Sequence, residues 1–307
     1  MSKVSKLIKM IVYDRRRLVL AIVARIVKIG AFNHMEDSRY LGFLFYLHFG
    51  RRINWVNPQT YNEKLQWLKL YDRRPEYSIM VDKYKVREYV AEKIGAEHLI
   101  PSMGVWESAD EIDFEKLPNR FVLKCNHNSG FGFFICKDKS KLHIQSVRKI
   151  LSKGLKQDFF FTGREWPYKD VPRRIIAEEF MTDDKGELWD YKFYCFDGEP
   201  KIALVVTDRF ESPGFSKFDY FDMEWNHLAF SQGGANSSKD IEKPGSFKQM
   251  IAISKALSKG IPHVRVDLYE IHGQVYFGEL TLYDSSGFAA FNPEKWDYTF
   301  GSWINLP

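Results

Sequence analysis

Cysteine is scarce in this sequence of 307 residues, and a continuous apolar run of about 20 residues is missing. The three cysteines, Cys125, Cys136 and Cys195, are too few and too scattered for a disulfide framework or a zinc site. Their odd number favours a reducing compartment. Because neither a membrane-spanning segment nor a small-residue cleavage site is recognisable near the start, the sequence predicts a cytoplasmic protein.

An excess of one charge is also missing from most of the chain, since 45 basic residues face 40 acidic ones. The net charge of +5 does not by itself indicate nucleic acid, and no such partner is expected. Residues 1–30 hold the surplus, with eight Lys or Arg residues and a single acid, Asp14. Apolar residues recur every three to four positions between 18 and 27, which predicts a basic amphipathic helix. Such a helix either makes peripheral contact with the inner membrane or packs on the body of the protein.

Helical and strand patterns are both present after residue 35, and the apolar content of 45% is enough to bury a large core. Residues 35–77 have helical spacing, and Asn57 with Pro58 predicts a helix start. Because strands then alternate with a few helices and no repeat divides the chain, an α+β protein is expected. Strands are expected at 121–124, 133–136, 174–178, 191–196, 201–207, 264–269 and 275–279, and helices at 87–94, 144–154 and 250–259.

The first cluster with chemical potential is a strand that ends in Lys124, a small polar loop with Gly130 and Gly132, and a returning strand. Backbone N–H groups of such a loop can approach phosphate oxygens while the lysine ammonium neutralises them. No Gly-Lys-Ser/Thr follows, so this is not a Walker A motif. An ordinary β-turn with an edge lysine is the structural alternative.

Two weaker clusters flank it. The apolar strand 174–178 leads into Glu178 and Glu179, where backbone can pair with the adenine edge and an acid can accept ribose hydroxyls. A buried strand that emerges with solvated acids would look the same. Residues 81–87 combine Asp82 and Lys83 with further basic residues, and are equally typical of a solvated basic helix.

The most specific cluster is a predicted hairpin with a turn at His272–Gly273. Alternation places Arg265, Asp267 and Tyr269 on one side of its first strand, and Phe277, Glu279 and Thr281 on one side of its second. Pairing then sets Asp267 opposite Glu279. Two adjacent carboxylates repel each other unless a cation joins them, and oxygen ligands favour magnesium. An exposed hairpin with a patch of charges is the alternative.

In their order along the chain, these clusters resemble the nucleotide half of the ATP-grasp superfamily over about residues 82–281. The sequence after about residue 50 is more specifically similar to the TupA-like ATP-grasp family, named for teichuronopeptide biosynthesis. The similar runs are NEKLQWLKLYD, VDKYKVREYV, FVLKCNHNSG, GREWPYK, RIIAEEFM, DYKFYCFDGEPK, VRVDLY and YFGELT.

This resemblance implies an ATP-grasp fold in which two α+β lobes sandwich ATP, preceded by an N-terminal helical region. The domains expected are a basic amphipathic helical segment at 1–34, a helical cap at 35–80 and an ATP-grasp domain at 81–307. The flap subdomain of that domain is expected at about 115–180.

The resemblance also implies roles for the basic and small residues. Lys83 and Lys124 contact the ATP phosphates, and Lys192 points at the triphosphate. A loop closes over the phosphates with Asn128, Ser129, Gly130 and Gly132.

The acidic residues likewise acquire implied roles. Glu178, with backbone from Glu179 to Met181, holds adenine, and Asp190 or Asp183 meets the ribose.

The metal and catalytic residues follow from the same resemblance. Asp267 and Glu279 bind one or two magnesium ions, and Arg265 faces the reacting acyl phosphate, so that Arg265 and Lys124 are the catalytic candidates. Thr281 stands where the superfamily often has asparagine, and its hydroxyl is a candidate magnesium ligand.

The implied reaction is carboxylate–amine ligation, in which ATP phosphorylates a carboxylate and an amine displaces phosphate. The implied setting is a bacterial surface polysaccharide, with an anionic glycan or glycolipid acceptor and an amino acid or peptide donor. A sugar kinase would need the same ATP site, and a glycosyltransferase or a glycan-binding scaffold remain alternatives. Asp183–Asp184 has no acidic partner nearby that would suit a sugar-nucleotide metal.

Three other features are weaker candidates for substrate contact. His127 lies beside the loop, Trp166 is suited to stacking on a sugar ring, and residues 283–288 follow the second strand of the hairpin. A histidine in a turn more often has a structural role, and such a role suits Trp166 and residues 283–288 as well as substrate contact does.

Overall fold

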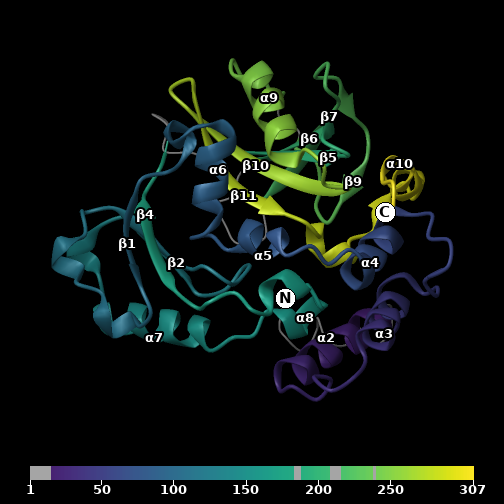
Figure 1. The fold of residues 1–307 in the computed structure, drawn as a ribbon, viewed down its shortest axis with the longest axis horizontal. Helices are drawn as coiled ribbons and strands as arrows, with labels where there is room; N and C mark the ends of the chain where they lie inside the picture. The colour runs from purple at the N-terminus through teal and green to yellow at the C-terminus, as the bar shows by residue number, and fades with distance from the viewer. Residues whose placement is uncertain (1–14, 183–187, 208–215, 238–239) are drawn as a thin grey trace.

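The computed structural model describes residues 15–182, 188–207, 216–237 and 240–307. Two antiparallel sheets form the body of this part of the chain, with helices packed around them (Figure 1). One sheet has four strands in the order β1-β4-β2-β3, and the other has six in the order β11-β10-β5-β6-β7-β8. The predicted α+β class is confirmed.

The four-stranded sheet consists of β1 (Ser102–Trp106), β2 (Phe121–Cys125), β3 (Phe133–Cys136) and β4 (Ile175–Glu179). Alternate residues of β2 are fully buried because one face of the sheet is covered by α7 (Ile144–Leu155). Val147 and Leu151 of α7 lie on one helical stripe and pack in the same core as Leu123. The opposite face of the sheet remains available for a ligand.

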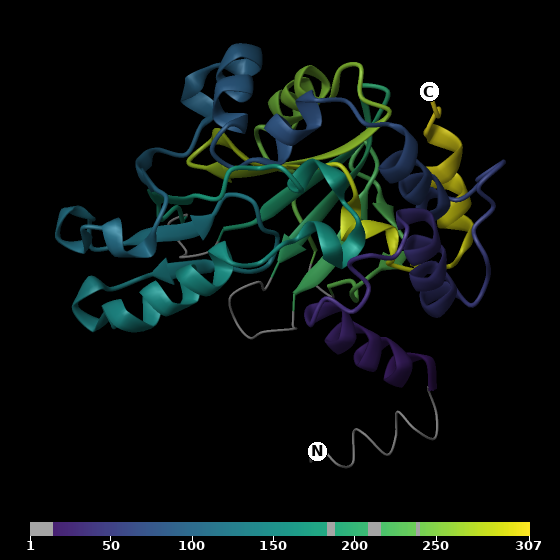
Figure 2. The same cartoon turned by 60° about the horizontal axis from the view of Figure 1, so that its bottom comes forward.

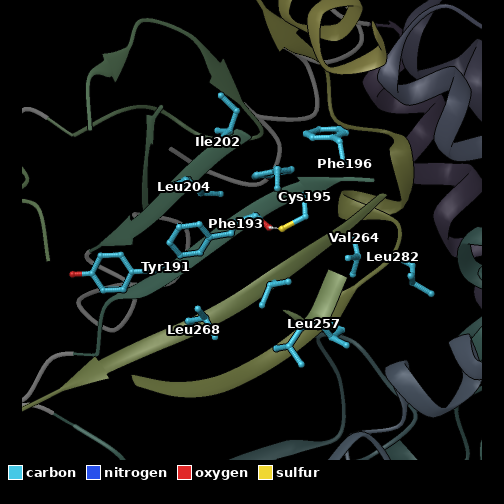
Figure 3. Close-up of a cluster of buried hydrophobic side chains, with 14 of the residues drawn as sticks. Tyr191, Phe193, Cys195, Phe196, Ile202, Leu204, Leu257, Val264, Leu268 and Leu282 are labelled. Atoms are coloured by element: carbon cyan, nitrogen blue, oxygen red, sulfur yellow. Dashed lines mark hydrogen bonds between the residues drawn. The ribbon is translucent and has the colours of Figure 1, made fainter. Parts of the chain in front are cut away.

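The six-stranded sheet consists of β5 (Asp190–Phe196), β6 (Glu199–Thr207), β7 (Lys217–Phe221), β8 (His227–Leu228), β10 (His263–Ile271) and β11 (Gln274–Thr281). Helix α9 (Phe247–Ser258) packs on β5, β6 and β10. Figure 3 shows Phe193, Cys195 and Val264 in the same hydrophobic cluster as Leu257 of this helix. Because side chains alternate along a strand, Lys192 and Asp267 point to the other face.

Four α-helices lie along the chain between residue 37 and the first strand. They are α3 (Asp37–Phe49), α4 (Tyr61–Tyr71), α5 (Glu76–Val81) and α6 (Val86–Ile94). The predicted start of α4 at Asn57–Pro58 is a few residues early, because Thr60 and Glu63 form a reciprocal capping box. The C-terminal helix α10 (Lys295–Trp303) packs on α4.

The predicted N-terminal helix is confirmed from residue 15 onward as α2 (Arg15–Lys28), and residues 1–14 lie outside the described part. This helix, purple in Figure 2, contacts α3 and the short helix α8 (Phe160–Gly163). In the described ranges, no helix is both long and apolar enough to cross a membrane.

The remaining short elements connect these layers. Strands β9 (Ser231–Gln232) and β12 (Phe291–Asn292) pair with each other. The 3₁₀ turns are η1 (Ala96–His98), η2 (Ala109–Glu111), η3 (Phe114–Lys116), η4 (Lys139–Lys141), η5 (Trp166–Tyr168) and η6 (Asp284–Gly287).

Candidate functional site

A cleft of about 560 Å³ lies between the two sheets, lined by residues from β2, β3 and β4 on one side and from β5, β10 and β11 on the other. Most of the residues predicted from the sequence line it. They are Lys83, Lys124, Asn128, Ser129, Gly130, Glu178, Glu179, Met181, Asp190, Lys192, Asp267 and Glu279. Segments separated by almost 200 residues in the sequence thus meet at one cavity.

The carboxylates of the hairpin meet as predicted, since Asp267 pairs with Glu279 across β10 and β11. The predicted position of Phe277 is wrong. The register shifts directly beyond this pair, where Leu268 pairs with Phe277 and leaves Gly278 as the extra residue of a β-bulge. Phe277 therefore shares the face of Leu268 and joins the core, on the side away from Glu279.

Two lysines neutralise these carboxylates. Lys192 Nζ contacts Asp267 and lies 2.6 Å from Asp190 Oδ2. Lys83 Nζ lies 3.0 Å from Glu279 Oε1 and donates a 2.7 Å hydrogen bond to the carbonyl of Asn128. Lys192 thereby joins β5 to β10. Lys83 joins the segment between α5 and α6 to both β11 and the loop after β2.

The charges also set the ionisation of the two acids. Burial by itself raises the pKa of Asp267, but the neighbouring Arg265 and Lys192 charges outweigh it and hold that pKa below its usual range. Burial likewise raises the pKa of Glu279, and Lys83 outweighs this effect despite the opposing charge of Asp267. Both side chains are therefore carboxylates at neutral pH.

A further ion pair joins two neighbouring strands of the four-stranded sheet. Lys124 Nζ on β2 lies 2.5 Å from Glu178 Oε2 on the neighbouring strand β4. Arg87 approaches the other oxygen of Glu178 at 3.8 Å. Glu178 is buried whereas Glu179, the next residue, is exposed, because β4 ends there.

Arg265 lies behind the cleft, outside its described lining. Its guanidinium donates two hydrogen bonds to Asp267, of 2.7 and 2.8 Å, and also pairs with Asp284. It donates a 3.2 Å hydrogen bond to Thr281 Oγ1, which likewise does not line the cleft. Tyr194 donates to the second oxygen of Asp284 at 3.2 Å. Arg265 thus fixes the orientation of Asp267 together with Lys192.

The loop after β2 is held at both ends. The Asn126 amide donates to Asp82 at 2.7 Å and to the Pro172 carbonyl at 2.8 Å. Gly130 and Gly132 have positive φ, which favours glycine. A Cβ on Gly132 would lie 2.9 Å from the Cα of Gly154 in α7, so the loop passes directly against that helix. Of the predicted loop residues, Gly132 faces away from the cleft.

The weaker candidates lie elsewhere. His127 is buried and contacts the Gln157 carbonyl at 3.2 Å, while Trp166 packs against Tyr77. Asp183 and Asp184 lie outside the described residues. Residues 283–288 include Asp284, the partner of Arg265.

Sequence reasoning missed the apolar lining of the cleft. Val122, Phe133 and Ile135 from the β2–β3 hairpin, with Phe131 and Tyr269, complete its walls. The alternation of β2 was the available signal, because Val122 and Lys124 share one face while Leu123 points into the core.

The carboxylates fit magnesium bound together with a phosphate ligand. In the described ranges, no group of three or more His, Cys, Asp or Glu side chains is placed to hold a metal ion. Magnesium commonly takes one or two protein carboxylates and fills its other positions with substrate phosphates and water. Asp267 and Glu279 supply such a pair of hard oxygen ligands.

Comparisons with solved structures give similarity at low sequence identity. The chain is 19% identical to a D-alanine–D-alanine ligase from Bacillus anthracis, with a TM-score of 0.39. The matched region covers 66% of this chain and 57% of that enzyme. For the ligase of the same name from Helicobacter pylori, the identity is 13% and the TM-score 0.44. The matched region covers 80% of this chain and 69% of that enzyme. For the ADP complex of N5-carboxyaminoimidazole ribonucleotide synthetase, the identity is 14% and the TM-score 0.41. The matched region covers 72% of this chain and 50% of that enzyme. The chain thus spans little more than half of the Bacillus anthracis enzyme.

A comparison with curated proteins gives no match. The family model described as TupA-like ATPgrasp matches residues 63–305, which include every predicted site residue. That range also contains both sheets and the cleft between them. The chain therefore has the ATP-grasp fold and belongs to the TupA-like ATP-grasp family.

Proposed function

We propose that this protein is an ATP-dependent carboxylate–amine ligase that acts through an acyl phosphate. The observation that carries the proposal is the arrangement of Asp267, Glu279, Lys83 and Lys192 at one end of the cleft between the sheets. Two carboxylates and two ammonium groups suit a triphosphate with its metal, because the lysines can pair with phosphate oxygens once the metal neutralises the acids.

The nucleotide lies along the cleft. Adenine binds at the end of β4, where Glu178 and the backbone from Glu179 to Met181 meet the apolar side chains of Val122 and Ile135. Asp190 binds the ribose. An apolar slot with a few polar groups at its edge is the usual environment of a planar ligand.

The phosphates lie between Glu178 and the paired carboxylates Asp267 and Glu279, next to the nucleoside. Lys83, Lys124 and Lys192 contact them, and the loop from Asn128 to Gly132 closes over them. The support is that these ammonium groups, three described cations from separate elements, all line the same cavity. Fixed positive charges stabilise a transferring phosphoryl group because they need no rearrangement during the reaction.

Asp267 and Glu279 hold one or two magnesium ions, with Thr281 as a further ligand. When bound, the metal supplies charge neutralisation for the phosphates. Arg265 and Lys124 are the catalytic residues of the proposal. Arg265 orients Asp267 through its two hydrogen bonds, and its positive charge stabilises the acyl phosphate from behind that carboxylate.

We further propose that the reaction joins an amino acid or peptide to a uronic acid of a bacterial surface polysaccharide. The anionic glycan or glycolipid acceptor agrees with the basic residues at 1–30. These residues would hold the enzyme at the cytoplasmic face of the inner membrane, where they attract anionic lipid as well.

The test is to incubate the full chain with ATP, magnesium, an amino-acid pool and glucuronic or galacturonic acid glycans, and to follow ADP, phosphate and product mass. Hydroxylamine added in place of the amine traps an acyl phosphate as a hydroxamate. We expect a new amide mass and a hydroxamate, both reduced by more than about 100-fold in Asp267→Asn, since phosphoryl transfer depends on its metal and charge arrangement.

The exposed Asp170→Asn is the matched control, and it should retain wild-type activity. A phosphorylated glycan without amide would make the protein a sugar kinase. Glycan transfer from a sugar nucleotide without ATP turnover would make it a glycosyltransferase. Failure of the wild-type chain to bind ATP would overturn the ligase and kinase proposals together.

A further inference from the structure

A second cavity of about 1030 Å³ adjoins the cleft, and Asn128 and Phe131 line both. It is lined by residues of α2, α3, α7, α8 and η6 and opens to solvent, and α8 lies between α7 and α2 in Figure 1. A cavity of this size beside the nucleotide cleft is therefore a candidate substrate site.

Apolar side chains make up most of the walls. Leu20, Val23 and Val27 of α2 face the cavity, as do Phe161 of α8 and Phe288 after η6. The exposed charged side chains Lys153, Lys156 and Asp158 also line it, near the C-terminal end of α7. The buried wall thus suits a bulky apolar group.

One carboxylate is buried in the wall. Glu165, 5% exposed, lines the cavity together with Ser286. Behind them, the ammonium of Lys69 donates to Ser286 Oγ at 2.8 Å, to the carbonyls of Gly163 and Ser286 at 2.8 Å, and to Gln66 Oε1 at 3.0 Å. Its three protons are therefore committed to protein acceptors. The charge that a ligand meets here is the negative charge of Glu165.

The backbone around this carboxylate is closely packed. Ser286 adopts a left-handed conformation with φ of 54°, which is uncommon for a residue other than glycine. Gly163 lies so close to Ser286 Oγ that a Cβ at this position would collide with the hydroxyl. Burial raises the pKa of Glu165, and the neighbouring charge of Lys69 opposes the rise. Burial lowers the pKa of Lys69 in turn, and the charge of Glu165 opposes that shift. The raised pKa makes Glu165 a stronger base than an exposed carboxylate.

We propose that this second cavity receives the amine substrate of the ligase, a primary amine carried on a bulky apolar body, and that Glu165 accepts the proton of its ammonium group. The inference rests on the ligase function proposed above. The apolar body contacts the α2 and α8 walls, and the ammonium pairs with Glu165. The amine then lies next to Asn128, where the cavity meets the phosphate end of the cleft.

The chemical step balances without another reactant. The ammonium gives one proton to Glu165, and the free nitrogen lone pair forms a bond to the acyl carbon. The bond from that carbon to the phosphate oxygen breaks, so inorganic phosphate leaves with the bonding electrons. The second proton lost by the nitrogen passes to the phosphate or to water, and an amide remains.

Binding of octylamine and of octanol to the full chain at pH 8, measured by calorimetry, tests the inference. The two probes share an apolar stem and differ in charge. We expect Glu165→Gln to weaken octylamine binding by about tenfold or more, because a charged hydrogen-bond partner is lost, and to change octanol binding by less than about twofold. An equal effect on both probes, or none on octylamine, would overturn the role of Glu165.

Ala24→Trp tests the cavity itself. Ala24 is exposed and lines the cavity, whereas Ala21 is an exposed alanine of the same helix outside the lining. Ala24→Trp should weaken both probes by about tenfold because the indole fills the space, and Ala21→Trp should leave both unchanged. Ile150→Trp, on the facing helix α7, provides a second filling variant. Probe binding that survives both filling variants places the ligand elsewhere.

Affinity for ATP is measured on the same samples. Retained ATP binding shows that each variant is folded. A wild-type chain that binds no ATP refutes the ligase proposal, whereas octylamine binding that none of the variants alters refutes the cavity proposal alone.

Discussion

Tyr61 and His263 form a buried pair whose hydroxyl and Nε2 lie 2.9 Å apart, and the other ring nitrogen of His263 contacts the Cys195 carbonyl at 2.9 Å. Burial lowers the pKa of His263 to about 3. The unfolded chain takes up a proton below its usual pKa of about 6.5 while the folded chain does not. Stability from this residue is therefore present above pH 6.5 and lost as the pH falls.

We expect a change from pH 7.5 to 5.0 to remove about 2 kcal/mol of unfolding free energy through His263 alone. His263→Gln removes this titration, so the variant should lose less stability over the same interval, as measured by urea unfolding at both pH values. The exposed His143→Gln is the control and should keep the wild-type pH dependence. An unchanged pH dependence in His263→Gln would show that the fold does not lower the pKa of His263.

The sheet face on which each charged residue lies was largely predictable where side chains alternate regularly along a strand. Lys192, Arg265 and Asp267 lie on the functional face as the period of two requires. The partners of these charges were less predictable, because a sequence gives no distance between separate elements. The pairing of Arg265 with Asp284 and of Lys83 with Glu279 depends on how η6 and α6 pack against the sheet.

Strand β11 illustrates the same limit at the scale of an element. Its existence and its pairing with β10 follow from the sequence, but the bulge at Gly278 reverses the face of every residue before it. Glycine is needed there because a Cβ would lie 2.9 Å from Tyr269 Cε2 and 3.0 Å from the Asp267 carbonyl. The bulge thus lets Glu279 face the cleft while Phe277 fills the core.

Gly278→Ala should lower the unfolding free energy by about 1–3 kcal/mol, the usual effect of overpacking, and raise the KM for ATP because Glu279 and Tyr269 shift. Urea unfolding and steady-state kinetics measure the two effects. Gly42→Ala on α3 is the matched control, since no atom lies within 4 Å of its added Cβ. That control should be neutral or more stable by about 0.5–1 kcal/mol. Equal stability of the two variants would mean that the bulge adjusts freely.

At the scale of the whole molecule, the cleft joins segments that are distant in sequence. Lys83 contacts both Glu279 in the six-stranded sheet and the loop after β2 in the four-stranded lobe. The order of motifs predicted that these segments belong to one site. The second cavity was not predictable, because its walls come from five elements whose packing has no local sequence signal.

A ligand that binds across this cleft should stabilise the fold as a unit. A ligand that binds only the folded state, present at 100 times its dissociation constant, raises the unfolding free energy by about 2.7 kcal/mol. For a chain of this size, this raises the melting temperature by about 5 °C. We expect that shift with ATP and magnesium, and a smaller one with ATP and a chelator, because the phosphates then face Asp267 and Glu279 without a neutralising cation.

In Glu279→Gln the two shifts in melting temperature, with and without magnesium, should converge, since one of the two carboxylates is lost. The exposed Glu224→Gln should keep the difference between them, as measured by thermal unfolding. Equal shifts with and without magnesium in the wild-type chain would show that the lysines alone hold the phosphates and that the paired carboxylates do not bind a metal.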